Sequence, residues 1–245
     1  MDVTTTGLFL SALFFGGLTT GLAGFALALV VSGIWLHILT PTQTVTLIVG
    51  YNLLTQSYAI WKLRHALSWG RVAPFIVGGA VGVPIGTALL TWINPAHLRI
   101  GVGVLLLLYS IYSLARPALK PVQSSSPIDL GVGFFNGLLG GLTALTGIIV
   151  TVWCQLRAWP KDEQRTVFQP VNLAAVVMSA ISLSIAGAVT LETAKLYLLG
   201  LPVMMAGMWV GLKLYGKLDD AAFRKVLLWL LLVSGLALVA PLLGL

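Results

Sequence analysis

The residues best suited to chemistry in this chain are glycines and threonines, which occur twice in the same arrangement inside apolar sequence. The first copy is GGLTTGLAG over residues 16–24, and the second is GGLTALTG over residues 140–147. Glycine lets the backbone approach a ligand, and threonine hydroxyls can replace the water around an oxyanion. The amides at a helix N-terminus also favour anions. We therefore predict a substrate site for a small anion at the two copies, formed by Thr19, Thr20, Gly21, Gly24, Gly140, Gly141, Thr143 and Thr146.

A second set of polar residues follows further along each half of the chain. Asn52 and Gln56 are four residues apart and share a helix face, as do Arg165, Gln169 and Asn172. Polar residues within a membrane span usually face the bundle interior, so we add the two asparagines and two glutamines to the predicted site. The asparagines could instead bridge helices structurally, and Arg157 and Arg165 are better explained as markers of the cytoplasmic rim.

Glycine at helical spacing has a second explanation, close packing of the GxxxG kind. The pattern occurs at Gly17–Gly21, Gly82–Gly86 and Gly207–Gly211. Packing is the better explanation for the last two pairs. A site is the better explanation at the two repeated stretches, where threonines accompany the glycines.

The elements that must position these residues are membrane helices. The chain has 245 residues, of which 58% are hydrophobic and 9% charged, far from the quarter charged that is usual in soluble domains. Its net charge of +7 comes from basic residues in short connections, which orient membrane proteins, so nucleic-acid binding is not expected. We predict an all-α, multi-pass protein with about eight apolar segments, at residues 7–39, 42–61, 72–93, 98–115, 128–156, 166–189, 194–214 and 223–245.

The two halves of the chain resemble each other. Phe14, Gly17 and Gly21 recur as Phe134, Gly137 and Gly141, 120 residues later, and Asn52 recurs as Asn172. We predict a first repeat over residues 1–117, a polar linker rich in proline and serine over 118–127, and a second repeat over 128–245.

Charge indicates that the repeats are inverted. Of the eight segments, the second and fourth are followed by basic residues in the first half, and the fifth and seventh in the second half. Equivalent loops of the two halves therefore differ in their content of basic residues, which places them on opposite sides of the membrane. Inversion requires an odd number of crossings in each half. The long first segment of each half, broken by glycine, could enter and leave on the same side. The alternative is one long tilted helix at each place.

Other chemistry lacks the residues that it needs. No acidic residue lies deep in a span, His37, His65 and His97 stand at segment ends, and Cys154 is the single cysteine. No nucleotide-binding, hydrolase or metalloprotease motif occurs. We expect no catalytic residues, no metal and no cofactor, and hence no enzyme.

Four stretches of the chain are characteristic: GGLTTGLAGFALALV, GGAVGVPIGTALL, FFNGLLGGLTALTGIIV and WPKDEQRTVFQPVN. Through them the chain resembles, over nearly its whole length, the sulfite exporter TauE/SafE family. Family members typically have a G-x-G-G-G cluster, which is replaced here by Gly21-Leu22-Ala23-Gly24 and by Gly140-Gly141. The resemblance implies a carrier in the inner membrane for sulfur-containing anions such as sulfite and organosulfonates.

We therefore expect a secondary transporter or facilitative carrier of small sulfur-containing oxyanions or organosulfonates, working by alternating access in the bacterial inner membrane. Its partners would be the anion and the lipid bilayer, and a homo-oligomer is compatible with the sequence. The alternatives are a carrier of another small solute, such as a metal cation or an organic molecule, and a membrane assembly protein that transports nothing. An intramembrane enzyme would need a nucleophile and base that three peripheral histidines do not supply.

Overall fold

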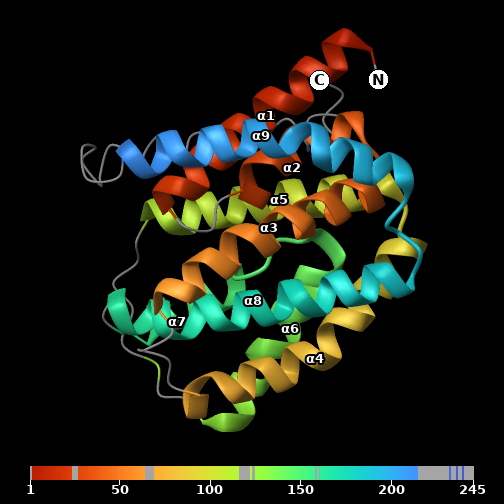
Figure 1. Cartoon of the computed structure of the whole chain (residues 1–245). Helices are drawn as coiled ribbons and strands as arrows, with labels where there is room; N and C mark the ends of the chain where they lie inside the picture. Colours follow the sequence, from red (N-terminus) through yellow and green to blue (C-terminus); the bar gives the residue numbers. More distant parts are fainter. Residues whose placement is uncertain are drawn as a thin grey trace. The chain divides into compact units, whose positions relative to one another are not determined.

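The structure, a computed structural model, contains helices joined by turns, and no strands, over the residues that it describes: 2–23, 27–63, 69–115, 122, 125–157, 159, 161–214, 232, 236 and 239. The predicted last segment, 223–245, lies almost wholly outside these residues. The helices (Figure 1) are α1 (Val3–Ala23), α2 (Leu27–Ile38), α3 (Pro41–Leu63), α4 (Trp69–Trp92), α5 (Pro95–Ala115), α6 (Ser126–Thr143), α7 (Ile148–Leu156), α8 (Lys161–Ile185) and α9 (Leu191–Leu214).

Five of the described helices are long and apolar enough to cross a membrane, by their length and composition. These spans are Val3–Leu22, Trp69–Trp92, Pro95–Tyr112, Thr166–Ile185 and Leu191–Leu214. The prediction of an all-α, multi-pass membrane protein is thereby confirmed.

The contacts divide the chain into two compact units that do not coincide with its two halves. The first unit contains residues 1–47, 93–117 and 191–245, and the second contains 48–92 and 118–190. Each unit therefore combines helices of both halves, and α3 contributes to both units. The predicted repeats remain a prediction about sequence, since the contacts cut across them.

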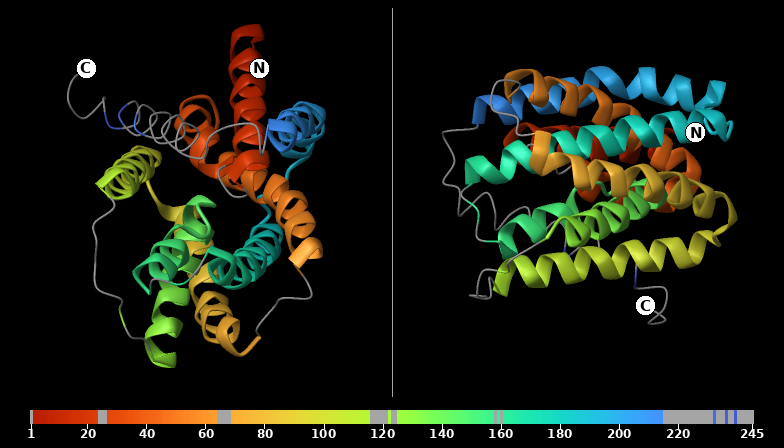
Figure 2. Two further views of the ribbon diagram at one scale, coloured as in Figure 1. Left: turned by 90° about the vertical axis from the view of Figure 1, so that its left-hand side faces the viewer. Right: turned by 90° about the horizontal axis from the view of Figure 1, so that it is seen from below.

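Helices α1 and α9 form the main packing of the first unit, and Figures 1 and 2 show α1 crossing α9 obliquely. Glycine makes this possible. A Cβ on Gly17 or Gly21 would overlap the carbonyl oxygen of Met204 or Met208, and a Cβ on Gly207 would overlap that of Phe14. Only residues without a side chain allow two helix backbones to approach this closely.

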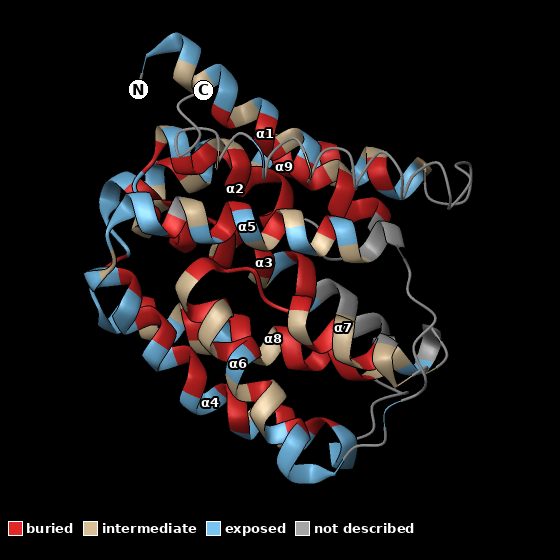
Figure 3. Cartoon of the chain, turned by 180° about the vertical axis from the view of Figure 1, so that it is seen from behind, coloured by how far each residue is buried: buried red, intermediate tan, exposed pale blue. Residues whose placement is uncertain are grey.

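Helices α4 and α6 pack in the same way in the second unit. Gly78, Gly82 and Gly86 of α4 lie against the carbonyl oxygens of Leu130, Phe134 and Leu138. Buried residues mark the facing sides of these helices in Figure 3. The packing explanation of the Gly82–Gly86 and Gly207–Gly211 pairs is confirmed.

The two interfaces have the same place in the predicted sequence repeat. In that prediction α1 corresponds to α6 and α4 to α9, and in the structure the first helix of each half packs on the fourth helix of the other half. The repeated glycines thus have a structural purpose in addition to any role at a site.

Candidate functional site

The second repeated stretch ends α6 and forms a buried break before α7. Ala144 adopts a left-handed conformation with φ 59°, and its N–H donates to the Gly140 carbonyl at 2.8 Å. Gly147 follows with φ 93°, and α7 begins at Ile148. All residues from Thr143 to Ile148 are buried. The irregular residues between α6 and α7 confirm the predicted helix break here. Their burial is expected, because irregular backbone within a membrane protein occurs only inside protein or around a cavity.

Two amide side chains from different helices meet the backbone of Gly147 at this break. The Gly147 N–H donates to Asn136 Oδ1 of α6 at 3.0 Å. A Cβ on Gly147 would overlap the side-chain amide of Asn172 on α8, so the glycine leaves room for that amide. Asn136 and Asn172 are each 1% exposed. We call Asn136, Gly147, Gln169 and Asn172 the amide cluster.

The amide cluster contains polar atoms without a hydrogen-bond partner. These atoms are Nδ2 of Asn136, both Nδ2 and Oδ1 of Asn172, and Oε1 of Gln169. Gln169 stands three residues before Asn172, on the same face of α8. Buried polar groups are nearly always paired, and each unpaired one costs about 1–3 kcal/mol. Several such atoms at one break indicate a place for a ligand.

Two further features shape the backbone around the cluster. Pro170 lies inside α8 next to Gln169, and a proline has no N–H to donate to the Thr166 carbonyl. On the other side, the first N–H groups of α7 have no acceptor within the helix itself. The Thr166 carbonyl and the first N–H groups of α7 therefore lack the partners that a continuous helix would give them.

The predicted residues of the second stretch have different places. A Cβ on Gly140 would lie 2.7 Å from Thr146 Cγ2, so these two residues line the break together. The Thr143 hydroxyl donates to the Leu139 carbonyl at 2.7 Å and accepts the Leu145 N–H at 3.2 Å. Gly141 instead faces α4, where its Cβ would overlap the Val83 carbonyl oxygen.

The predicted residues of the first stretch belong to the first unit. The Thr19 hydroxyl is bonded to carbonyls of its own helix, Phe15 at 2.9 Å and Gly16 at 3.0 Å. The Thr20 hydroxyl is buried without a partner. Gly21 lies in the α1–α9 interface, and Gly24 lies outside the described residues.

Asn52 and Gln56 lie buried on α3, one turn apart as predicted. The Gln56 Oε1 atom has no partner. Both residues fall in the part of α3 that belongs to the second unit.

An ionic network lies at the opposite end of α7 from the amide cluster. Asp129 of α6 accepts the Trp153 indole N–H at 2.8 Å and pairs with Arg157 at 3.3 Å. The Arg157 guanidinium lies 4.2 Å from the centre of the Trp159 ring.

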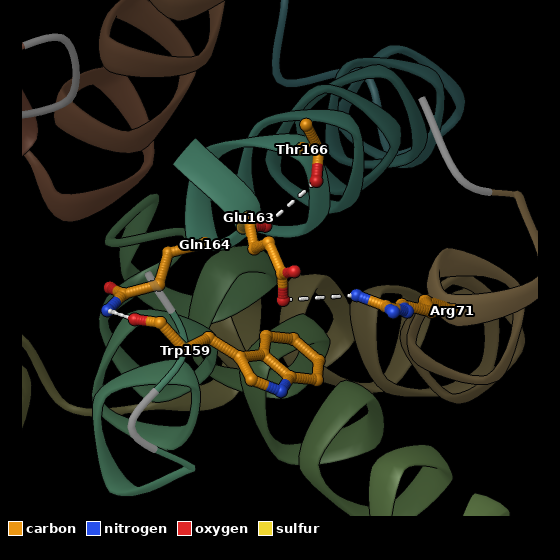
Figure 4. A network of polar contacts seen from close by, with 5 residues as sticks. All are labelled: Arg71, Trp159, Glu163, Gln164 and Thr166. Carbon is orange, nitrogen blue, oxygen red and sulfur yellow. Dashed lines mark hydrogen bonds and ion pairs between the residues drawn. The ribbon is translucent and has the colours of Figure 1, made fainter. Parts of the chain in front are cut away.

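Nearby, Arg71 of α4 pairs with Glu163 of α8 at 3.3 Å (Figure 4). A polar cavity of about 310 Å³ is lined by Gly70, Arg71, Pro74, Ser126, Asp129, Arg157 and Trp159. The side chain of Arg165 lies outside the described residues.

Two members of the cluster were absent from the site predicted from the sequence: Gly147, which ends the second repeated stretch, and Asn136. Asn136 lies in the apolar run FFNGLLGG, one turn before Gly140. A lone amide within a span, just before a glycine break, is the signal that could have identified it.

Long apolar helices and a buried helix break define a multi-pass α-helical membrane protein, and broken helices of this kind are typical of transporters. The chain belongs to the sulfite exporter TauE/SafE family, whose model matches residues 8–238. Membership makes it a membrane transporter of sulfur-related anions. The chain has no significant match among curated proteins or among solved structures.

Proposed function

We propose that this protein carries small sulfur-containing oxyanions or organosulfonates across the bacterial inner membrane, and that the amide cluster at the α6–α7 break binds them. The observation that carries the proposal is a pair of buried amide side chains beside Gly147, Asn136 and Asn172, whose Nδ2 groups both have no hydrogen-bond partner. Family membership supports the substrate class.

Neutral donors suit a transported anion. The Nδ2 groups of Asn136 and Asn172 can donate to the anion's oxygens, and the N-terminal amides of α7 add the positive end of the helix dipole. These groups replace the water of the anion without a permanent charge. A fixed buried cation would hold the anion more strongly and slow its release.

The glycine interfaces limit how access can alternate. Rocking one half of the chain against the other as rigid bodies would open both the α1–α9 and the α4–α6 contacts. Backbones in contact through glycines repack poorly, so we infer that each of these pairs stays together during transport.

Ligand-dependent thermal stability of the purified protein tests the site. Sulfite, sulfate, thiosulfate, sulfoacetate, taurine, phosphate and acetate are compared at matched ionic strength. A ligand that binds only the folded state adds about 2.7 kcal/mol at one hundred times its Kd. We expect a sulfur-containing anion to raise Tm selectively, and Asn136→Ala and Asn172→Ala to abolish this rise.

Ser179→Ala is the matched control. Ser179 is on α8 two turns beyond Asn172, is fully buried and also has an unpartnered hydroxyl. It should keep the ligand response. A substitution at Gly141 would be uninformative, because it would disturb the α4–α6 packing whether or not the residue binds substrate.

The same experiment tests the alternatives. A response to cations or organic solutes in place of anions would support a carrier of another solute. An anion response that survives both asparagine substitutions would place the site elsewhere. Proteoliposomes loaded with the anion that raises Tm provide a transport assay. Efflux of that anion with the unmodified protein, and no efflux with Asn172→Ala, would exclude a membrane assembly protein that transports nothing.

A further inference from the structure

The amide cluster has acceptors as well as donors without partners. Asn136 Nδ2 and Asn172 Nδ2 offer N–H groups, whereas Asn172 Oδ1 and Gln169 Oε1 offer lone pairs. Turning the Asn172 amide over exchanges its two atoms and leaves an acceptor in either orientation. A ligand that satisfies the cluster must therefore bring a hydrogen-bond donor of its own.

We propose that the site selects an oxyanion in its singly charged, protonated form, hydrogen sulfite among the sulfur oxyanions, over the doubly charged form. This inference rests on the proposed function and narrows it, because within the class of sulfur-containing oxyanions and organosulfonates it favours ligands that carry a hydrogen-bond donor.

Hydrogen bonding gives the first reason. A fully deprotonated oxyanion has only acceptors, so its oxygens would face Asn172 Oδ1 or Gln169 Oε1 acceptor to acceptor. The proton of a protonated oxyanion can point at one of these oxygens while its other oxygens accept from the asparagine N–H groups. A buried acceptor without a partner carries a desolvation penalty. The protonated form would remove this penalty by donating to the acceptor, whereas the dianion would increase it by repulsion between the two oxygens.

Charge gives the second reason. The four residues of the amide cluster have no formal charge, and the Born cost of burying an ion grows with the square of its charge, so a dianion costs about four times as much as a monoanion. The described charges on the helices around the cluster are paired: Asp129 of α6 with Arg157, which follows α7, and Arg71 of α4 with Glu163 of α8. Three further charged residues are on α8, and their side chains lie outside the described ones. Arg165 stands one turn before Gln169, and Lys161 and Asp162 stand at the helix start.

The test is the apparent Kd for sulfite, measured from Tm shifts below and above the second pKa of sulfurous acid. Each shift is taken relative to chloride at the same pH and ionic strength, which removes any pH dependence of the protein itself. Sulfate, doubly charged throughout, and methanesulfonate, singly charged without an acidic proton, serve as comparison ligands. Oxygen is excluded so that sulfite is not oxidised.

We expect the apparent Kd for total sulfite to rise about tenfold for each pH unit above that pKa, because only the protonated fraction binds. Sulfate and methanesulfonate should bind at least about tenfold more weakly than sulfite at the lower pH, with no comparable pH dependence. Gln169→Met, which removes an acceptor at similar size, should reduce the preference for sulfite over methanesulfonate. Ser179→Ala should preserve it.

Three outcomes would overturn the inference: sulfite binding that is independent of pH, binding that strengthens as pH rises, or methanesulfonate binding equal to sulfite at the lower pH. Each of them would leave an anion carrier standing. No response to any anion at either pH would instead overturn the proposed function. If Gln169→Met does not fold, the pH series on the unmodified protein still decides the question.

Discussion

The first and second halves of the chain hold their short helix against their first helix in different ways. In the first half, the Trp35 indole of α2 stacks on Phe9 of α1 at 4.7 Å and donates to the Phe9 carbonyl at 3.3 Å. In the second half, the Trp153 indole of α7 donates to the Asp129 carboxylate of α6 at 2.8 Å. Phe9 and Asp129 are equivalent positions, 120 residues apart.

The same divergence occurs nearer the breaks. Gly16 in the first half corresponds to Asn136 in the second. A Cβ on Gly16 would lie 2.8 Å from Val31 Cγ1, an apolar contact, whereas Asn136 accepts from the Gly147 backbone. At this pair of positions in the predicted repeat, the contact of the first half is thus apolar and that of the second half is polar. The polar contact has the features of a binding site, because its amides have hydrogen-bonding capacity left over.

The largest effect that we expect comes from the glycine interfaces, one within each unit: α1–α9 in the first and α4–α6 in the second. Gly82→Ala in α4 and Gly207→Ala in α9 would each place a methyl group on a facing carbonyl oxygen. Overpacking of this kind costs about 1–3 kcal/mol. The free energy of unfolding in detergent, from denaturant titration, measures it.

Gly131→Ala on α6 and Gly101→Ala on α5 are the controls, because nothing lies within 4 Å of a Cβ at either position. They should be neutral or stabilising by about 0.5–1 kcal/mol, the usual advantage of alanine over glycine within a helix. If Gly82→Ala or Gly207→Ala were as stable as these controls, the close approach at that interface would be wrong.

An intermediate effect should separate the ionic contact from the aromatic one. Asp129→Asn removes a charged partner of Arg157 and should cost about 1.5 kcal/mol, the lower end for hydrogen bonds to charged groups, because the pair is partly exposed. Phe9→Leu removes the stacking on Trp35 and should cost about 1 kcal/mol.

Salt distinguishes the two substitutions. At about 1 M salt the Debye length falls to about 3 Å, so the cost of Asp129→Asn should shrink while that of Phe9→Leu persists. Thermal melts at low and high salt measure both costs. Equal salt dependence of the two variants would contradict the contrast between the halves.

The smallest effect should come from the exposed ion pair of the second unit. The Arg71 and Glu163 side chains are 54% and 47% exposed, and solvent screens such pairs. Glu163→Gln should change the free energy of unfolding by less than about 0.5 kcal/mol. A larger loss in the same melts would mean that this pair supports the end of α8 as strongly as Asp129 supports α7.

Much of the site could be predicted from the sequence, and its limits have physical causes. The break at residues 140–147 follows from glycine content, and the helix face shared by Gln169 and Asn172 follows from helical spacing; both are local properties. Asn136 was missed because its significance depends on Gly147, eleven residues later, whose N–H it accepts. The hydroxyls of Thr19 and Thr143 were predicted to face a ligand, but they bond to carbonyls of their own helices, as threonine often does within a helix.

The sequence by itself determined the class of the protein, because long apolar segments with few charged residues are stable only in a lipid bilayer. It also determined where the second repeated stretch interrupts its helix, because the positive φ of Gly147 is a conformation that glycine adopts readily. Only the tertiary structure decided what the repeated glycines touch. A glycine with no side chain can serve a ligand or a neighbouring backbone equally well, and the choice at Gly21 and Gly141 was made by helices α9 and α4, which come from the other half of the chain.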